Sequence, residues 1–397
     1  MITKIELQDW KSFKETTMYI DPLSIIIGKN ASGKSNVLDA LQFVQYISSG
    51  QPISDAVNTV RGGADWLIRK GEKECVVRIT MGDESGATEY VYAISICRKD
   101  KSFYISSESL KRIIRKRYKR IIFETCGDNT MNVPMTSARI YAARKGRQKR
   151  MNFNLTTSVL SQIEFINVVK DVKTTVSCVL QDLRNIFVLS PDPQKMHNFI
   201  PLSESLSPDG ANVAGVLAGM SDEERQIVEQ QITKFVEKLP ERDIQRVWTE
   251  KVGMFDSYAM LNCEEEWTPG NSLALDARGM SDGTLRFIAI AVALLTRPQG
   301  SLLVIDEIDN GLHPSRSKQL IDMLMSIGEE RQIDILCTTY NPILVNTLGI
   351  QMIPFISFVR RNEENAYSEI VLLEDLPNLA KLLAAGNIGE LMAQNIL

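Results

Sequence analysis

Histidine is almost absent from this sequence, and cysteine is too sparse and scattered to build a framework. The 397 residues contain only two histidines, His197 and His313, and six cysteines, none of which forms a Cys-x-x-Cys pair. These counts argue against a zinc site or a disulfide framework. Reduced cysteines that mostly pack in the interior are therefore the default expectation.

The sequence also lacks a long apolar run and a strong charge of either sign. No stretch is long enough to span a bilayer, and the start of the chain has no apolar core of a signal peptide. We therefore expect a cytoplasmic protein without a membrane partner. The formal net charge of -4 gives no global signature of nucleic-acid binding, so a surface of that kind would have to be local.

Strands and helices alternate at both ends of the chain, which is typical of a parallel or mixed sheet with helices packed against it. The pattern predicts strands at 2–7, 23–27, 302–305 and 333–338, an antiparallel meander with strands at 75–81, 89–97 and 102–107, and helices at 34–47, 284–296 and 315–327. Between Glu108 and Trp267 the pattern predicts mostly helix, including a capping box that begins at Ser221. No sustained heptad register supports a coiled-coil arm.

From this pattern we predict an α/β fold with a mixed sheet, an antiparallel meander and an inserted, mostly helical lid. Three segments are expected. They are an N-terminal lobe at 1–107, the helical and basic lid at 108–267, and a C-terminal lobe at 268–397.

A glycine-rich loop follows the buried strand at 23–27. Gly28-Lys29-Asn30-Ala31-Ser32-Gly33-Lys34-Ser35 fits G-x-x-x-x-G-K-[ST] at every fixed position, and it lies between a predicted strand and a predicted helix. Backbone N–H groups of such a loop turn inward around a β-phosphate, and the helix N-terminus adds a favourable dipole. We predict that this segment and Asn36 bind ATP, with Lys34 on the β- and γ-phosphates and Ser35 on Mg²⁺. A glycine turn without a ligand is the remote alternative.

An apolar strand that ends in two carboxylates carries the second motif. Leu302-Leu303-Val304-Ile305 leads to Asp306 and Glu307. Asp306 is expected to hold Mg²⁺ through water, and Glu307 to polarise the attacking water as general base. Many strands of α/β proteins end in acids, so this motif gains its weight from the glycine loop upstream.

Around these motifs the sequence resembles ABC-type ATPases, in the branch that contains RecF, the SMC heads, the overcoming-lysogenization-defect nucleases and many bacterial anti-phage ATPases. Asp306–Pro314 resembles the Walker B and D-loop segment, and Met280–Arg286 resembles the signature motif, with Ser281 and Gly283 in the characteristic places. Trp10–Lys14 resembles the basic-aromatic start of these heads, and Gly386–Leu391 the tail of compact heads. The resemblance covers both ends of the chain well and the middle poorly.

The resemblance implies a P-loop NTPase fold with an ABC-type head that forms a homodimer, or a higher homo-oligomer, around ATP. Lys11 and Ser12 would lie near the nucleotide. Ser281, Asp282 and Gly283 would form a second phosphate cradle that closes on ATP bound by the partner subunit. Since ADP lacks the γ-phosphate, hydrolysis should loosen the dimer. An ordinary helix N-cap is the alternative for Ser281, because Ser and Asp are good caps.

The sequence departs from the family pattern in two places. Tyr340 stands where the switch segment usually has a histidine that contacts the γ-phosphate. Tyrosine donates a hydrogen bond but does not titrate near neutrality, so slow turnover, or ATP as a clamp only, remains an alternative to Tyr340 as a catalytic residue. The Q-loop glutamine is not identified, and Arg61–Asp65 is the candidate region.

Two basic clusters occupy the predicted lid. They comprise Lys111, Arg112, Arg115, Lys116, Arg117, Lys119 and Arg120, and then Arg144, Lys145, Arg147, Lys149 and Arg150. Local clusters of this kind suit phosphate backbones. A solvated face or a docking surface for an acidic partner is an equal alternative, and we expect Tyr118 to pack rather than to stack on bases. No module for base-specific recognition is present.

The resemblance implies an ATPase that regulates a separately encoded effector, often a nuclease, in bacterial anti-phage defence. A RecF-type ATPase of genome maintenance and a catalytically weak ATP-dependent scaffold are the alternatives. A self-contained nuclease is disfavoured, because the sequence leaves no room for a Toprim domain after the switch segment. A transporter motor and a small-molecule kinase are also disfavoured.

Overall fold

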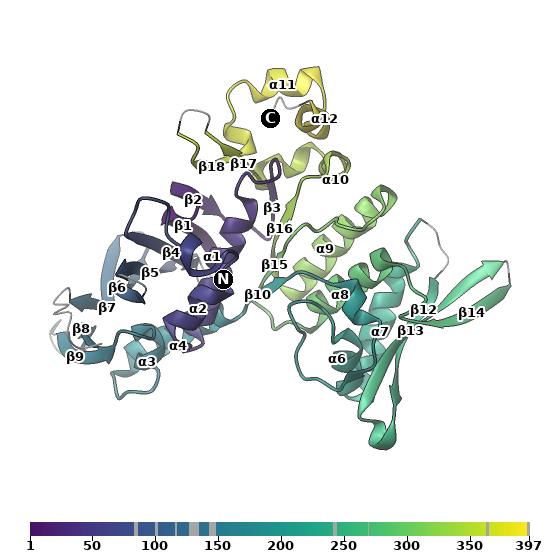
Figure 1. Cartoon of the computed structure of the whole chain (residues 1–397), viewed down its shortest axis with the longest axis horizontal. Helices are drawn as coiled ribbons and strands as arrows, with labels where there is room; N and C mark the ends of the chain where they lie inside the picture. The colour runs from purple at the N-terminus through teal and green to yellow at the C-terminus, as the bar shows by residue number, and fades with distance from the viewer. Residues whose placement is uncertain are drawn as a thin grey trace. The chain divides into compact units, whose positions relative to one another are not determined.

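The computed structural model describes residues 1–82, 86–99, 102–115, 117–126, 135–142, 148–240, 244–268, 270–362 and 365–394. The chain divides into two compact units. Figure 1 shows its helices and strands. Unit 1 comprises Met1–Phe187, Gly300–Leu302 and Ser357–Asp375, and unit 2 comprises Val188–Gln299, Leu303–Ile356 and Leu376–Leu397. Each unit takes residues from more than one of the segments 1–107, 108–267 and 268–397, so units and predicted segments are different partitions of the chain.

A mixed sheet forms the body of unit 1, with the strand order β3-β17-β18-β2-β1-β4-β5-β6-β7-β8-β9. Its strands are β1 Ile2–Trp10, β2 Phe13–Tyr19, β3 Leu23–Ile27, β4 Glu74–Gly82, β5 Thr88–Lys99, β6 Ser102–Ile114, β7 Tyr118–Cys126, β8 Met135–Tyr141, β9 Gln148–Asn154, β17 Ile356–Arg361 and β18 Ser368–Leu372. Strands β4 to β9 form an antiparallel meander, whereas β18 pairs with β2 in parallel at Ser368 and Phe13.

The helices of unit 1 are α1 Lys34–Ser48, α2 Ile53–Thr59, η1 Gly63–Trp66, α3 Val159–Ile163, α4 Lys170–Arg184 and η5 Leu373–Asp375. Helix α1 is fixed by Trp10, whose ring lies 5.5 Å from that of Phe43 and whose Nε1 donates to the carbonyl of Asn36 at 2.8 Å. Trp10 is fully buried, so the aromatic start of the chain serves as core. These contacts hold the first turns of α1 in place after β3.

The prediction of mostly helix between 108 and 267 is wrong for the described residues of 108–154, and wrong again for 244–267, where the chain also forms strands. Strand β6 continues to Ile114, and β7, β8 and β9 follow it. The many basic residues in this stretch hide the two-residue period, and a register shift between Leu110 and Lys111 interrupts it further. In β8 the alternation is regular, since Thr136, Ala138 and Ile140 are buried while their neighbours are not. That signal was available from the sequence.

In unit 2 three strands pair in the order β10-β15-β16, and they are Ile186–Leu189, Leu302–Ile305 and Asp334–Thr339. Its helices are α5 Pro193–Met196, α6 Val213–Gly219, α7 Asp222–Val236, α8 Asp282–Thr296, η3 Pro314–Arg316, α9 Ser317–Arg331, α10 Pro342–Leu348, η4 Ile350–Phe355, α11 Leu379–Ala385 and α12 Ile388–Ala393. The predicted helices at 284–296 and 315–327 are confirmed. No helix of the described residues is long and apolar enough to cross a membrane.

The tail motif at 386–391 has a packing role within unit 2. A Cβ on Gly389 would lie 2.0 Å from the carbonyl oxygen of Pro342, and the Gly389 N–H donates to Asn346 Oδ1 at 2.7 Å. Asn387 and Glu390 form a capping box at the start of α12. The glycine therefore permits α12 to lie directly against α10.

A separate four-stranded sheet of unit 2 takes its strands from both sides of α6 and α7 in the sequence. Strands β11 Ile200–Pro201 and β14 Asn271–Asp276 both pair with β13 Tyr258–Thr268, which pairs in turn with β12 Ile244–Val252. Helix α7 starts at the predicted Ser221 capping box. The Glu229 carboxylate of this helix accepts a hydrogen bond from the backbone N–H of Thr249 in β12, at 2.7 Å.

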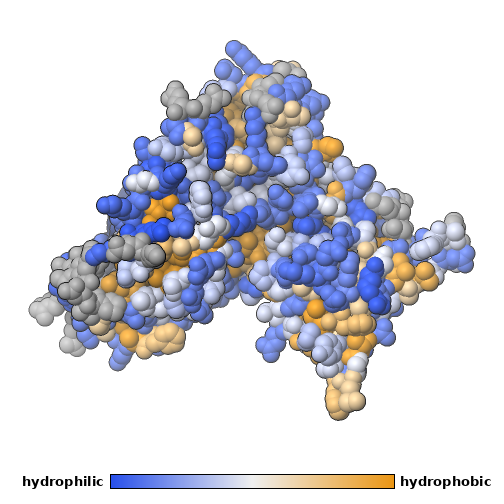
Figure 2. Space-filling model, in the orientation of Figure 1, coloured by the Kyte–Doolittle hydropathy of each residue, from blue (hydrophilic) through white to orange (hydrophobic). Residues whose placement is uncertain are grey.

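The turn η2, Met254–Asp256, joins β12 to β13 and presents apolar side chains to solvent. Met254 is 78% exposed and Phe255 is 91% exposed. Figure 2 shows this tip in the hydrophobic colours at the lower end of the molecule. Phe255 and Asp256 both adopt positive φ angles, of 65° and 51°, which are strained values for residues with a Cβ.

Candidate functional site

The glycine loop of unit 1 is shaped by two glycines that have no room for a side chain. Gly28 has a φ of 151° and Gly33 one of 113°. A Cβ on Gly28 would lie 2.3 Å from the carbonyl oxygen of Val359, and one on Gly33 would lie 2.6 Å from Ser368 Oγ. Both positions thus require glycine for its conformation and for the close approach of β17 and β18.

Lys34 turns back onto the loop that precedes it. Its Nζ donates to the carbonyl oxygens of Gly28, at 2.7 Å, and of Lys29, at 2.9 Å, and the side chain is buried. The Ser32 hydroxyl is also buried, and it has no hydrogen-bond partner among the described residues. The loop thus contains the buried ammonium of Lys34 and the Ser32 hydroxyl without a partner, between two glycines that leave the backbone open. This combination fits the phosphates of a nucleotide.

Ser12 and Ser368 connect this loop to two strands. The hydroxyls of Ser12 and Ser368 lie 2.7 Å apart, and the Ser368 hydroxyl donates to the carbonyl oxygen of Ser32 at 2.6 Å. Asn36 Nδ2 donates to Ser12 Oγ at 2.7 Å. Ser12 and Asn36, both predicted at the nucleotide, therefore lie in one hydrogen-bonded group with the loop. Ser368 was missed, and nothing in its local sequence marks it.

Lys11 is held by helix α1. Its Nζ forms an ion pair with the fully buried Asp39 and donates to the carbonyl oxygen of Arg61 at 2.9 Å. Arg61 Nε lies 3.3 Å from Asp39 Oδ1. Lys11 and the first residue of the Q-loop candidate thus share one carboxylate, which the sequence did not single out. A direct contact of Lys11 with nucleotide stays a prediction.

In unit 2, the Thr338 hydroxyl forms hydrogen bonds with both residues that follow β15, the carboxylate of Asp306 and the backbone N–H of Glu307. Its Oγ1 donates to Asp306 Oδ1 at 2.7 Å and accepts from the backbone N–H of Glu307 at 2.8 Å. Glu307 has a φ of 46°, and strained backbone of this kind persists only where neighbouring contacts enforce it. Thr338 therefore fixes the direction of the Asp306 carboxylate and the backbone of the predicted base. Two threonines at the end of a buried strand were the available signal for it.

Thr339 makes the corresponding contacts one residue further along. Its hydroxyl donates to Asp309 Oδ1 at 2.6 Å and accepts from the Asn341 N–H at 3.0 Å. Tyr340 lies between these two anchored residues and is 45% exposed. The phenol of Tyr340 is thus presented from a fixed backbone, and its catalytic role stays a prediction.

The predicted signature residues begin helix α8. Ser281 caps the helix, because its Oγ accepts from the Thr284 N–H at 3.1 Å. A Cβ on Gly283 would lie 2.9 Å from the carbonyl oxygen of Gly311, so this glycine permits the D-loop segment to approach. Asp282 is close to Gln194 Nε2, at 3.4 Å. The N-cap geometry agrees with both readings of Ser281, and a cradle for a partner's ATP stays a prediction.

Arg286 lies one turn further along α8 and is also buried. Burial lowers the pKa of its guanidinium, and the negative charge of Glu307 opposes that shift. A cation therefore sits in unit 2 within the electrostatic reach of the predicted base.

The two predicted Mg²⁺ ligands belong to different units, Ser35 to unit 1 and Asp306 to unit 2. Within the described residues, no group of three or more His, Cys, Asp or Glu side chains could hold a metal ion by itself.

One family model and several solved structures match this chain. A family described as "AAA domain, putative AbiEii toxin, Type IV TA system" matches residues 23–346. No curated protein matches the sequence. The crystal structure of an SMC head bound to the C-winged helix domain of ScpA matches with a TM-score of 0.52 at 17% identity, over 93% of this chain and 97% of that one.

Two further solved structures are similar. The SMC head domain from Thermotoga maritima has a TM-score of 0.45 at 13% identity, over 94% of this chain and 98% of that one. An Smc head domain with an extended coiled coil, bound to the C-terminal domain of ScpA and derived from Pyrococcus furiosus, has a TM-score of 0.48 at 13% identity, over 97% and 98%. The predicted α/β architecture of a P-loop head is confirmed by the SMC head bound to the winged-helix domain.

Proposed function

From the premise that this chain belongs to the AAA domain family described as putative AbiEii toxin, type IV TA system, we propose that it hydrolyses ATP and uses the bound nucleotide to close a homodimer. One observation carries the proposal. A glycine loop holds a buried lysine and a hydroxyl without a partner. In unit 2, an acid pair at the end of an apolar strand supplies the complementary chemistry.

The residues take distinct roles in the proposed reaction. Lys34 and the N–H groups of the loop bind the phosphates, and Glu307 accepts the proton of the attacking water. Ser35 and Asp306 would hold Mg²⁺, which supplies charge neutralisation on the phosphates. Tyr340 donates a hydrogen bond toward the γ-phosphate in place of the usual histidine. Because tyrosine carries no positive charge, turnover in this protein is expected to be slow.

A substitution at Ser281, in the predicted signature motif, tests whether ATP closes the dimer. Ser281→Arg should leave ATP binding by a single subunit unchanged and abolish ATP-induced dimerisation, because a long cation would fill the cradle for the partner's phosphates. Light scattering with ATP and with ADP measures the mass, and fluorescent ATP measures the affinity. The matched control is Ser272→Arg, at an exposed serine of β14. Normal ATP-induced dimerisation of Ser281→Arg would remove the signature assignment.

Thr338 provides a test of how the acid pair is held. Thr338→Val should lower kcat by about 5- to 150-fold, since it leaves Asp306 Oδ1 and the Glu307 N–H without this partner at a cost of about 1–3 kcal/mol. ATP affinity and KM should change little. Thr338→Ser keeps the hydroxyl and should restore most of the turnover. A valine variant with the kcat of wild type, or a serine variant as slow as valine, would contradict this role.

We also propose that a separately encoded effector, such as a nuclease, reads the ATP state in anti-phage defence. The family description, which names a toxin, supports this role, and the similar SMC head is itself bound to a domain of another protein. A reading frame for a nuclease or toxin beside the gene would favour defence. Repair genes there would favour the RecF-type alternative.

A further inference from the structure

The topology of unit 1 brings the described members of the two basic clusters to one end of its sheet. Strand β6 ends at Ile114 where β7 begins at Tyr118, and β8 ends at Tyr141 where β9 begins at Gln148. Because neighbouring strands are antiparallel from β6 to β9, these four strand ends lie at the same end of the sheet. Lys116, Arg144, Lys145 and Arg147 lie outside the described residues, and nothing below depends on them.

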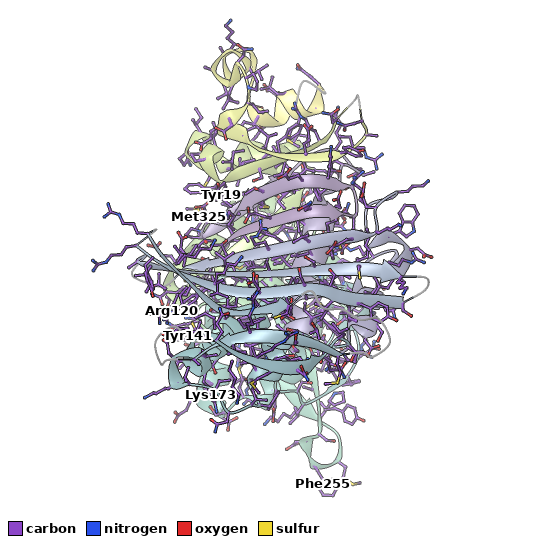
Figure 3. All side chains as sticks on the ribbon, turned by 90° about the vertical axis from the view of Figure 1, so that its left-hand side faces the viewer. Tyr19, Arg120, Tyr141, Lys173, Phe255 and Met325 are labelled. Atoms are coloured by element: carbon purple, nitrogen blue, oxygen red, sulfur yellow. The ribbon has the colours of Figure 1, made fainter. Side chains whose placement is uncertain are left out.

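Helix α4 adds its first turn to this end of the sheet. Arg112 donates to both carboxylate oxygens of Asp171, at 2.8 and 2.9 Å, and Arg120 Nη1 donates to Asp171 Oδ2 at 3.1 Å. Figure 3 shows Arg120, Tyr141 and Lys173 along one side of the unit. The exposed basic side chains here are Arg115, Arg117, Lys119, Lys149, Arg150, Lys170 and Lys173. We call this set, with Tyr118 and Arg120, the basic end.

The charge of the basic end is poorly compensated. Asp171 faces two guanidiniums, and the hydrogen bond from Arg112 lowers the pKa of its carboxyl. Within the described part of the chain, Arg117, Lys119 and Lys149 form no ion pair with an acid. In a chain with a formal net charge of -4, such a concentration is a local exception. It creates a positive potential suited to a polyanion.

Aromatic rings lie among these cations. The Arg120 guanidinium carbon lies 5.4 Å from the ring centroid of Tyr118 and 4.7 Å from that of Tyr141. Arg120 Nη2 also donates to the Tyr118 hydroxyl at 3.2 Å, which fixes the ring. We expected Tyr118 to pack rather than to stack on bases; its side chain contacts Arg120 and is also 53% exposed. A ring that is oriented by a cation and open to solvent is a stacking platform for a base.

We propose that the basic end of unit 1 binds single-stranded nucleic acid. Lys and Arg contact the phosphates, and Tyr118 stacks on a base. The favoured class is single-stranded, because aromatic side chains reach unpaired bases only. Binding should be tolerant of sequence and weakened by salt, since counterion release supplies most of the affinity. This property is independent of the proposed ATPase, because the surface uses none of the nucleotide-site residues.

Fluorescence anisotropy of labelled oligothymidylate, without ATP, tests the proposal. The triple variant Arg117→Glu, Lys119→Glu, Lys149→Glu should bind on the order of 100-fold more weakly at low salt, with a shallower salt dependence, because each lost phosphate contact reduces the slope by about 0.7. The matched control reverses three exposed lysines of unit 2, in Lys234→Glu, Lys238→Glu, Lys318→Glu, and should bind as wild type does.

Stacking is tested separately from charge. Tyr118→Ala should weaken binding about tenfold, whereas Tyr118→Phe should retain the affinity, because it keeps the ring. Thermal melts of all variants establish that unit 1 remains folded. Equal affinity of the triple variant and wild type would overturn the proposal, as would equal losses in the control triple. Polyglutamate serves as the probe for an acidic protein partner. If the basic end bound polyglutamate but did not bind oligothymidylate, the proposal would also be overturned.

Discussion

Glu307→Gln is expected to lower ATP turnover by about 100- to 10,000-fold while ATP still binds, which is the range for the loss of a general base. Glutamine keeps the size of the side chain but cannot accept a proton from the attacking water. The backbone of residue 307 should remain in place, because its N–H is held by Thr338 Oγ1 at 2.8 Å. Phosphate release at saturating ATP measures the turnover, and binding of fluorescent ATP is followed in parallel.

The control for this substitution is Glu330→Gln, at an exposed glutamate of α9 in the same unit. It should leave turnover unchanged. If ATP is spent on opening the dimer, Glu307→Gln should also accumulate the closed form in light scattering with ATP. Two preparations that are equally inactive, wild type and Glu307→Gln, would contradict the assignment as an ATPase and favour the scaffold alternative.

Lys34→Ala is expected to weaken ATP binding by about 10- to 100-fold or more. A hydrogen bond to a charged group contributes about 1.5–3 kcal/mol, and each 1.4 kcal/mol is tenfold in affinity. The lysine is already oriented toward the loop by the carbonyls of Gly28 and Lys29, so little ordering is required when phosphate binds. Isothermal titration with a slowly hydrolysed ATP analogue measures the affinity.

Lys73→Ala, at an exposed lysine of unit 1, is the matched control and should bind as wild type does. Because Lys34→Ala also removes two hydrogen bonds within the loop, its melting temperature without nucleotide must be measured alongside. A variant that is stable and binds ATP with wild-type affinity would remove the glycine loop from the nucleotide site.

The local motifs of this protein could be read from the sequence because their physical causes are local. The glycine loop combines a β-branched strand, two glycines and a helix start within a few residues. The Ser221 capping box depends on residues three apart, and it is present as predicted. The strand at 302–305 ends in its acids as expected.

The contacts that support those motifs could not be read in the same way. Ser368 meets Ser32 across 336 positions of sequence, and a single serine carries no mark of its distant partner. Lys11 and Asp39 lie 28 positions apart in the sequence. They pair because the end of β1 packs against α1 through Trp10. The role of Thr338 could have been predicted more easily. Two threonines end the buried strand β16, and the neighbouring strand β15 is followed by two acids.

The discontinuity of unit 1 has a consequence for how the protein is made. The floor under Gly28 and Gly33 is supplied by Val359 and Ser368, which the ribosome adds more than 300 residues later. Chains emerge from the ribosome with the N-terminus first, so a nascent polypeptide contains Gly28 and Gly33 long before the strands that support them. Nucleotide therefore cannot template the early folding of this unit. Under the proposed function, a nascent chain therefore gains its complete phosphate loop only after residue 368 has been added, and shorter chains stay out of the proposed ATP-dependent cycle.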